Sequence, residues 1–281
     1  MIIWLASYPK SGNTWVRVLI SNIINYEKID FDNPFGFTDQ IESYPNIKHF
    51  ASLGKDFNNP DDVVPNWIKT QNLLNLNNKI KIFKTHNMFG SFGKHSFTDL
   101  NNTAGVIHIV RDPRNVISSI NNHFHHDNMD ASMKFMFDKN KWVYNVDKND
   151  GVSPNFISSW GMHYFSWKNF QKNYLLIKYE DLLRNPMNEI KKIYNYLKKF
   201  FNLDLKDENF DKIIKLSSFE NLKNKENDGK FEENVKHFET KKKINFFDSG
   251  PSNDWKKKLD ESFRNDLKKE FTKEMKELGY I

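Results

Sequence analysis

The residues best suited to chemistry lie between positions 7 and 15, in the sequence Ser-Tyr-Pro-Lys-Ser-Gly-Asn-Thr-Trp. The apolar run 2–6 before them predicts a buried strand, and apolar pairs at four-residue steps after them predict a helix. Gly12 lets the backbone come close to a ligand, and Asn13 is a suitable N-cap for the helix. The free N–H groups of a helix start and the charge of Lys10 both favour an anion. The pattern therefore indicates a phosphate cradle.

This loop differs from the common phosphate-binding loops. In the pattern G-x-x-x-x-G-K-[ST] the lysine follows the second glycine, whereas Lys10 precedes Gly12, and the chain has no G-x-G-x-x-G. An ordinary strand-to-helix turn with a surface lysine explains the loop about equally well. Other parts of the chain must decide between the two interpretations.

Polar clusters also follow three further apolar runs, at 80–84, 105–110 and 174–178. Helical patterns between these runs favour a parallel sheet, in which ligands bind at the carboxyl ends of the strands. Asp112 is placed to cap a helix that begins at Pro113. The clusters expected at that edge of the sheet are Lys84-Thr85-His86, Arg111 and Tyr179-Glu180-Asp181.

The rest of the chain predicts helices and one long irregular segment. The segment 27–66 is rich in Asn, Asp and Pro but also in aromatic residues, so we expect it to form a pocket wall. In the final helix, apolar residues at four-residue steps over 259–275 favour docking on the core. The other expected helices are 67–76, 131–147, 155–172, 186–201 and 207–224.

Composition limits the class of protein. The 281 residues are 38% hydrophobic and carry a net charge of +6, with no block of five like charges, so a nucleic-acid partner is weakly supported. Without cysteine there are no disulfides or thiolate metal sites. His123, His125 and His126 lack a fitting carboxylate set, so no metal is expected. No run reaches 18 apolar residues and no basic leader precedes the first strand, which predicts a cytoplasmic protein without a membrane span.

Taken in order, these motifs resemble the sulfotransferases that use 3′-phosphoadenosine 5′-phosphosulfate (PAPS) as donor, most closely the cytosolic type. The loop 8–15 is similar to the family's 5′-phosphosulfate loop, and 84–86 to the strand end that carries its general base. The stretch from Val110 to Ser119 resembles the 3′-phosphate site, and 178–181 the segment that closes over the adenine. Ser159-Trp160 with His163 and Trp167 is similar to the family's long helix.

The resemblance implies one domain over 1–281 with a three-layer α/β/α fold and a central parallel sheet of four to five strands. It implies in-line transfer of a sulfuryl group to an alcohol, phenol, amine or sugar hydroxyl without a metal, and a homodimer is compatible with it. It assigns catalysis to His86 as general base, to Lys10 at the leaving oxygen and to Lys84 at the sulfuryl oxygens. It assigns donor binding to Lys10, Ser11, Gly12, Asn13, Thr14, Trp15, Arg111, Ser119, Tyr179, Ser217, Phe219, Ser249 and Gly250.

One departure from the family concerns the 3′-phosphate. The family has Arg-Lys-Gly a few residues before a Trp, where this chain has Asp248-Ser249-Gly250 before Trp255. The resemblance therefore leaves the 3′-phosphate to Arg111 and Ser119, with help from 241–243 or Lys256.

Less specific interpretations stay open at this point. A nucleotide kinase or a non-catalytic nucleotide-binding module would share the fold. Among single residues, His86 could simply cap a neighbouring group and His163 could serve packing alone. Arg111 could pair with the acidic residues at 180–181.

Overall fold

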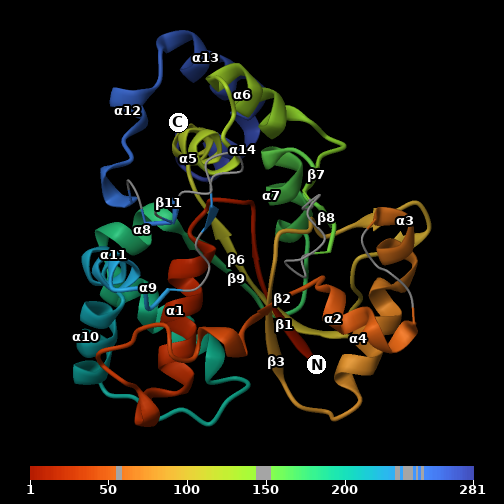
Figure 1. The fold of residues 1–281 in the computed structure, drawn as a ribbon, viewed down its shortest axis with the longest axis vertical. Helices are drawn as coiled ribbons and strands as arrows, with labels where there is room; N and C mark the ends of the chain where they lie inside the picture. Colours follow the sequence, from red (N-terminus) through yellow and green to blue (C-terminus); the bar gives the residue numbers. More distant parts are fainter. Residues whose placement is uncertain (55–58, 144–152, 232–234, 237–242, 245, 248–249) are drawn as a thin grey trace.

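The centre of the protein is a sheet of five parallel strands in the order β2-β3-β1-β6-β9, seen edge-on in Figure 1. The structure is a computed structural model that describes residues 1–54, 59–143, 153–231, 235–236, 243–244, 246–247 and 250–281. The parallel sheet of four to five strands is thus confirmed. Its strands are β1 (Ile2–Ser7), β2 (Glu42–Ser43), β3 (Lys81–Thr85), β6 (Thr103–Val110) and β9 (Tyr174–Lys178).

The central strand β1 explains why the sheet needs a helix layer on each face. All six of its residues are buried, as expected for a strand covered on both sides. Because successive side chains of a strand point to opposite faces, Ile3 and Leu5 enter one core and Ile2, Trp4 and Ala6 enter another. The three-layer α/β/α arrangement follows from this division.

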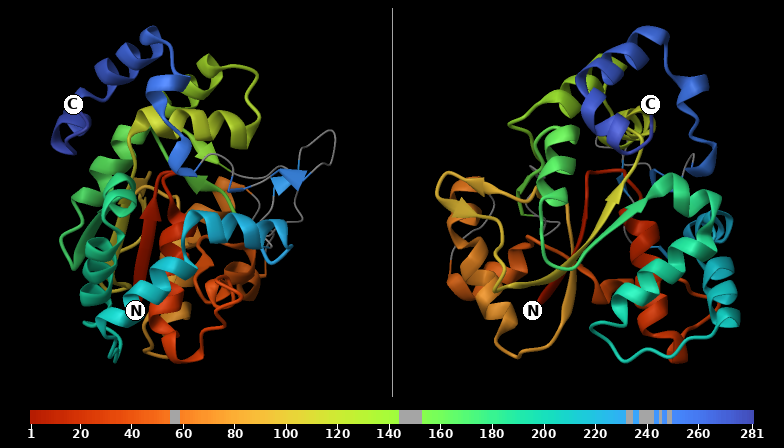
Figure 2. Two further views of the ribbon diagram at one scale, coloured as in Figure 1. Left: turned by 90° about the vertical axis from the view of Figure 1, so that its left-hand side faces the viewer. Right: turned by 180° about the vertical axis from the view of Figure 1, so that it is seen from behind.

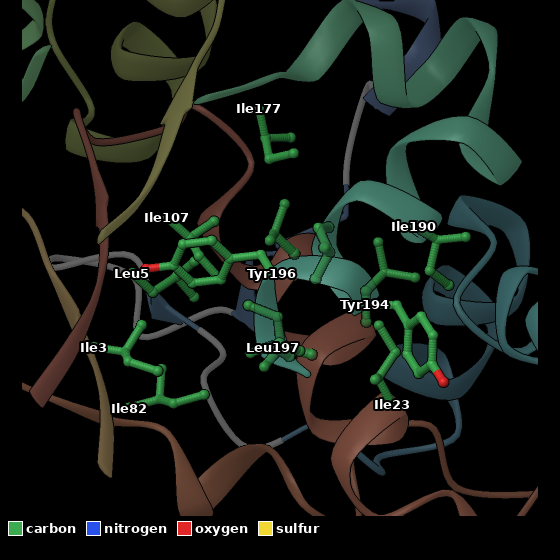
Figure 3. Packing of buried hydrophobic residues seen from close by; sticks show 14 of the residues in the cluster. Ile3, Leu5, Ile23, Ile82, Ile107, Ile177, Ile190, Tyr194, Tyr196 and Leu197 are labelled. Atoms are coloured by element: carbon green, nitrogen blue, oxygen red, sulfur yellow. The ribbon is translucent and has the colours of Figure 1, made fainter. Parts of the chain in front are cut away.

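Helices α1 (Asn13–Ile24), α9 (Pro186–Leu197) and α10 (Asp207–Leu216) cover the first face. Figure 3 shows Ile23 of α1 and Ile190, Tyr194 and Leu197 of α9 packed together with Leu5 and Ile107 of the sheet. Helices α2 (Ile47–Phe50), α3 (Pro60–Val63), α4 (Trp67–Asn75) and α7 (Trp160–Lys168) contribute to the core on the second face.

A third core lies beyond the carboxyl end of β6 and joins the C-terminal helices to the middle of the chain. It contains residues of α5 (Pro113–Phe124), α6 (Met129–Phe137), α7, α13 (Glu261–Glu270) and α14 (Thr272–Glu277). Figure 2 shows the C-terminal helices beside α5 and α6 in both views. The final apolar stripe is docked on the core, as predicted, because Leu267, Phe271 and Met275 are buried there. The single final helix expected over 259–275 is wrong, since α13 ends at Glu270 and α14 begins at Thr272.

Several element boundaries differ from the sequence prediction. The helix predicted over 131–147 ends at Phe137 and is followed by a strand, and the one predicted over 155–172 begins only at Trp160. Ser218 caps a new helix, so the helix predicted over 207–224 is two. The irregular segment contributes the edge strand β2, whose two residues are too few for a pattern. The remaining helices are α8 (Tyr179–Arg184), α11 (Phe219–Asn227) and α12 (Trp255–Lys258).

Short elements complete the chain. Three antiparallel strand pairs are β4 (Ser91–Phe92) with β5 (His95–Ser96), β7 (Trp142–Val143) with β8 (Asn155–Phe156), and β10 (Val235–Lys236) with β11 (Lys243–Ile244). The 3₁₀ helices are η1 (Tyr26–Lys28), η2 (Thr38–Gln40), η3 (Ala51–Leu53), η4 (Val64–Asn66) and η5 (Gly250–Ser252). Within the ranges given above, no helix combines the length and the apolar character needed to cross a bilayer.

Candidate active site

The predicted cradle is the loop between β1 and α1. Lys10 and Gly12 both have positive φ, 65° and 99°, so the chain turns sharply before the helix begins. Gly12 itself is the N-cap, in the left-handed region, and it has no side chain that could accept from the first N–H groups of α1. Such a helix start suits an anion.

The prediction that Asn13 is the N-cap is wrong. Asn13 is the first helical residue, and its Nδ2 donates to the Leu5 carbonyl oxygen at 3.1 Å and to Ser7 Oγ at 3.1 Å. It ties the helix start back to β1 and so holds the shape of the cradle. Gly12 is the N-cap because only glycine adopts a φ of 99° without strain.

His86 lies beside the end of the same central strand. Its Nδ1 is 2.8 Å from the Ser7 carbonyl oxygen, which can only accept, so Nδ1 carries the proton. Nε2 is then the basic nitrogen of the ring. Lys84 is half-buried near the end of the neighbouring strand β3 and precedes His86 by two residues. The structure thus brings His86 and the cradle together, as the motif order predicts.

Arg111 follows β6 and is 6% exposed. Its Nη1 donates to the Lys10 carbonyl oxygen at 3.2 Å and to Ser119 Oγ at 3.5 Å, and its guanidinium lies 4.1 Å above the centre of the Tyr179 ring. Glu180 does not pair with Arg111 but accepts from the Asp112 N–H at 2.9 Å. Arg111 and Ser119 are therefore adjacent, as the 3′-phosphate assignment needs.

Asn253 joins this pair and was not foreseen. It is buried, and its Nδ2 donates to Ser119 Oγ at 3.2 Å and to the Asn115 carbonyl oxygen at 2.8 Å. Because Ser119 Oγ accepts the Asn253 N–H, the Ser119 hydroxyl hydrogen points away from Asn253. No sequence signal marks an Asn that acts through a residue 134 positions away.

The residues predicted to surround the adenine also lie near one another. Trp15 Nε1 donates to the Ser217 carbonyl oxygen at 2.8 Å, and the Trp15 ring meets the Tyr179 ring edge-on at 5.6 Å. Phe219 contacts Gly250, since a Cβ added at Gly250 would lie 2.1 Å from the Phe219 ring. Burial raises the pKa of Tyr179, and the charge of Arg111 partly offsets this effect.

Lys10 also meets an aromatic ring that was not predicted, that of Phe246, whose centre lies 4.4 Å from Lys10 Nζ. Such a contact orients an ammonium group without neutralising it. Asp248, Ser249 and 241–242 fall outside the described residues, and Lys256 is exposed.

Two other histidines have lowered pKa values. His163 is buried with its ring edge-on to Tyr8 at 5.7 Å, and burial lowers its pKa well below the usual value, helped by His108 and His86. Burial, then the charges of Lys10, His86 and His125, lowers the pKa of His123 to about 3. Among described residues, no three His, Asp or Glu side chains are grouped to bind a metal.

These features place a helix start, His86 and the cations Lys10, Lys84 and Arg111 at the carboxyl ends of the strands of a parallel α/β sheet. A family model described as "Sulfotransferase domain" matches residues 2–279. The chain therefore belongs to the sulfotransferase family.

Individual relatives agree with this family. The luciferin sulfotransferase of Photinus pyralis is 25% identical over 262 residues, covering 92% of this chain and 67% of its own length. Sulfotransferase 1B1 of Canis lupus familiaris is 26% identical, covering 78% of this chain and 65% of its own length. The match thus spans about two thirds of these relatives.

Solved structures share the fold. Mouse sulfotransferase SULT7A1 complexed with PAP superposes with a TM-score of 0.59 at 20% identity, covering 98% of this chain and 84% of its own. Retinol dehydratase in complex with androsterone and the inactive cofactor PAP gives 0.60 at 16% identity, covering 98% and 80%.

The contact between Gly12 and Tyr179 gives a first prediction. A Cβ at Gly12 would lie 2.5 Å from Tyr179 Cδ2, in addition to the strain of an alanine at positive φ. We expect Gly12→Ala to destabilise the fold by about 2–4 kcal/mol, the sum of a left-handed residue and an overpacked contact. Gly93→Ala is the matched control, because Gly93 has a φ of 60° and nothing within 4 Å of its added Cβ. Denaturant unfolding gives the free energy of unfolding of both variants. If Gly12→Ala and Gly93→Ala lose the same free energy, the contact with Tyr179 is unimportant.

Proposed function

We propose that this chain transfers a sulfuryl group from PAPS to a hydroxyl or amine of a small-molecule acceptor, with His86 as general base. The observation that carries the proposal is the hydrogen bond from His86 Nδ1 to the Ser7 carbonyl oxygen. It fixes a basic nitrogen beside the strand that leads directly into the phosphate cradle. A base at that place is what transfer from a cradle-bound donor requires.

The donor-binding roles are assigned to groups that the fold brings to this edge. Backbone N–H groups of Ser11 to Thr14 would hold the 5′-phosphate, and Lys10 would stabilise the leaving oxygen. Lys84 would contact the sulfuryl oxygens. The adenine would lie among Trp15, Tyr179 and Phe219, next to Ser217 and Gly250, and the 3′-phosphate beside Arg111 and Ser119.

Unpartnered polar atoms support a polar ligand here. The hydroxyl groups of Ser11, Ser118 and Ser217 and Nε of Arg111 are buried and lack a hydrogen-bond partner among the described residues. Buried polar groups are nearly always paired, so several unpaired ones on the segments assigned to donor binding favour a ligand with many acceptors. An adenosine bisphosphate has such acceptors on both phosphates.

A nucleotide kinase and a non-catalytic nucleotide-binding module account for fewer of these features. A kinase of the P-loop type would have its lysine after the second glycine, whereas Lys10 precedes Gly12. A non-catalytic module would have no use for the fixed tautomer of His86.

Calorimetric titration with PAP and with ATP tests the proposed function. We expect PAP to bind at least about 10-fold more tightly, since ATP lacks the 3′-phosphate that Arg111 would bind. Transfer of ³⁵S from labelled PAPS, screened over phenols, alcohols and amines, should continue in EDTA. Tighter binding of ATP, or activity lost on chelation and restored by magnesium, would favour the kinase.

Substitution of the proposed base gives a second prediction for this site. His86→Ala should lower the rate of transfer by about 10²–10⁴-fold, the usual contribution of a general base. Its affinity for PAP should stay within about 2-fold of wild type, because His86 is not assigned to donor binding. A variant that keeps more than a tenth of the rate rules out His86 as the base.

Arg111 should set the preference for the 3′-phosphate. Arg111→Ala should reduce the ratio of PAP to AMP affinity by about 10-fold or more, the scale of one charge-assisted contact. The ratio, rather than PAP affinity alone, is decisive because Arg111 also holds the cradle through the Lys10 carbonyl. Arg184→Ala, which removes a largely exposed guanidinium on α8, is the control and should leave the ratio unchanged. An unchanged ratio in Arg111→Ala would move the 3′-phosphate site elsewhere.

A further inference from the structure

A buried carboxylate, Glu226, anchors the segment that covers Lys10. Glu226 is 0% exposed near the C-terminal end of α11. Its Oε1 accepts from the Phe246 N–H at 2.6 Å and its Oε2 from the Phe247 N–H at 2.9 Å. One carboxylate thus holds two consecutive backbone amides that lie 20 and 21 positions further along the chain.

Burying a carboxylate near the C-terminal end of a helix costs free energy. A carboxylate loses solvation when it is buried, and the C-terminal end of a helix carries partial negative charge. Two charge-assisted hydrogen bonds offset part of that cost and also fix the plane of the backbone they bind. An apolar residue would fill the same space more cheaply, but it would not fix those amides.

Both rings of the anchored segment belong to one aromatic cluster, but only Phe246 also contacts Lys10. Phe247 packs into the core cluster beside Phe35 and Phe231, with ring centres 6.1 and 5.3 Å away. Phe246 places its ring 4.4 Å from Lys10 Nζ, although it also touches Phe231 at 5.2 Å. The backbone that Glu226 holds therefore connects a fixed core residue to the ring on the cradle lysine.

We propose that Glu226 is a positioning residue for Lys10, acting through the Phe246–Phe247 backbone. This inference rests on the proposed function for its consequence in donor binding. With the amides fixed, the Phe246 ring covers one side of the Lys10 ammonium group. The ring thereby limits the positions that the ammonium group can occupy. The Lys10 ammonium group is thereby held beside the loop between β1 and α1, where the proposed function places the donor. The ring orients the cation without removing its charge, whereas a carboxylate in that place would compete with the donor.

The placement can be tested without any ligand, by NMR. In the wild-type protein the amide protons of Phe246 and Phe247 should resonate at low field, and the Lys10 Cε protons at high field because of the ring. Glu226→Gln should abolish both shifts, since a carboxamide accepts through one oxygen and turns an NH₂ toward the other amide. Glu270→Gln is the matched control, because Glu270 is an exposed glutamate at the C-terminal end of α13. Shifts that persist in Glu226→Gln would overturn the proposal.

Donor binding tests the consequence. We expect Glu226→Gln and Phe246→Leu each to weaken PAP binding by about 10-fold, and the double variant to be little weaker than either single one. If the two substitutions acted independently, their fold losses in PAP affinity would multiply in the double variant. If Glu226→Gln lowers only thermal stability, or if it tightens PAP, the positioning role is wrong. Because Glu226→Gln can unfold the protein, Phe246→Leu tests the same contact while leaving the buried carboxylate in place.

The failure of this inference is distinguishable from the failure of the proposed function. If the wild-type protein does not bind PAP, the proposed function fails, and the NMR comparison still decides whether Glu226 places Phe246 on Lys10. If the wild type binds PAP and the two variants bind equally well, the proposed function stands and Glu226 has no positioning role.

Discussion

The candidate site depends on the ring of Tyr179, which fills the space where three strand ends meet. One edge of the ring lies against the backbone of Gly12 so closely that a Cβ would clash, its face carries the guanidinium of Arg111, and Trp15 meets it edge-on. These partners follow β1 and β6, and Tyr179 itself follows β9. Because the strands are parallel, their carboxyl ends come together only at this edge, and a close-packed aromatic ring holds them in one geometry.

Two of the three cations assigned to the site lie against aromatic faces. Arg111 lies over Tyr179 and Lys10 over Phe246. A ring contact restricts where a cation points and leaves its charge available, which suits a site for a ligand with several phosphate or sulfate oxygens. The helix start at Gly12, a residue with no side chain of its own to form a cap, adds backbone donors to the same place. Membership of the sulfotransferase family and this arrangement of charge agree with each other.

Sequence patterns predict what depends on local periodicity and chain order. The apolar runs locate β1, β3, β6 and β9, and the parallel connection rule then brings Lys10, His86, Arg111 and Tyr179 to one edge, as found. Features that arise from distant contacts were missed. Gly12 rather than Asn13 caps α1 because Asn13 is used to bind β1, and Asn253, Phe246 and Glu226 act on residues far away in the chain. The edge strand β2 has only two residues, which leave no periodicity to detect.

The central claim is that one edge of the sheet holds two phosphates at once, one in the loop after β1 and one beside Arg111. A crystal structure of the protein with PAP tests this claim most directly. We predict the 5′-phosphate within hydrogen-bond distance of the backbone N–H groups of Ser11 to Thr14, and the 3′-phosphate on Arg111 and Ser119. His86 Nε2 should face the open side of the 5′-phosphate, where an acceptor would enter. PAP bound elsewhere, or bound with its 3′-phosphate away from Arg111, would contradict the account.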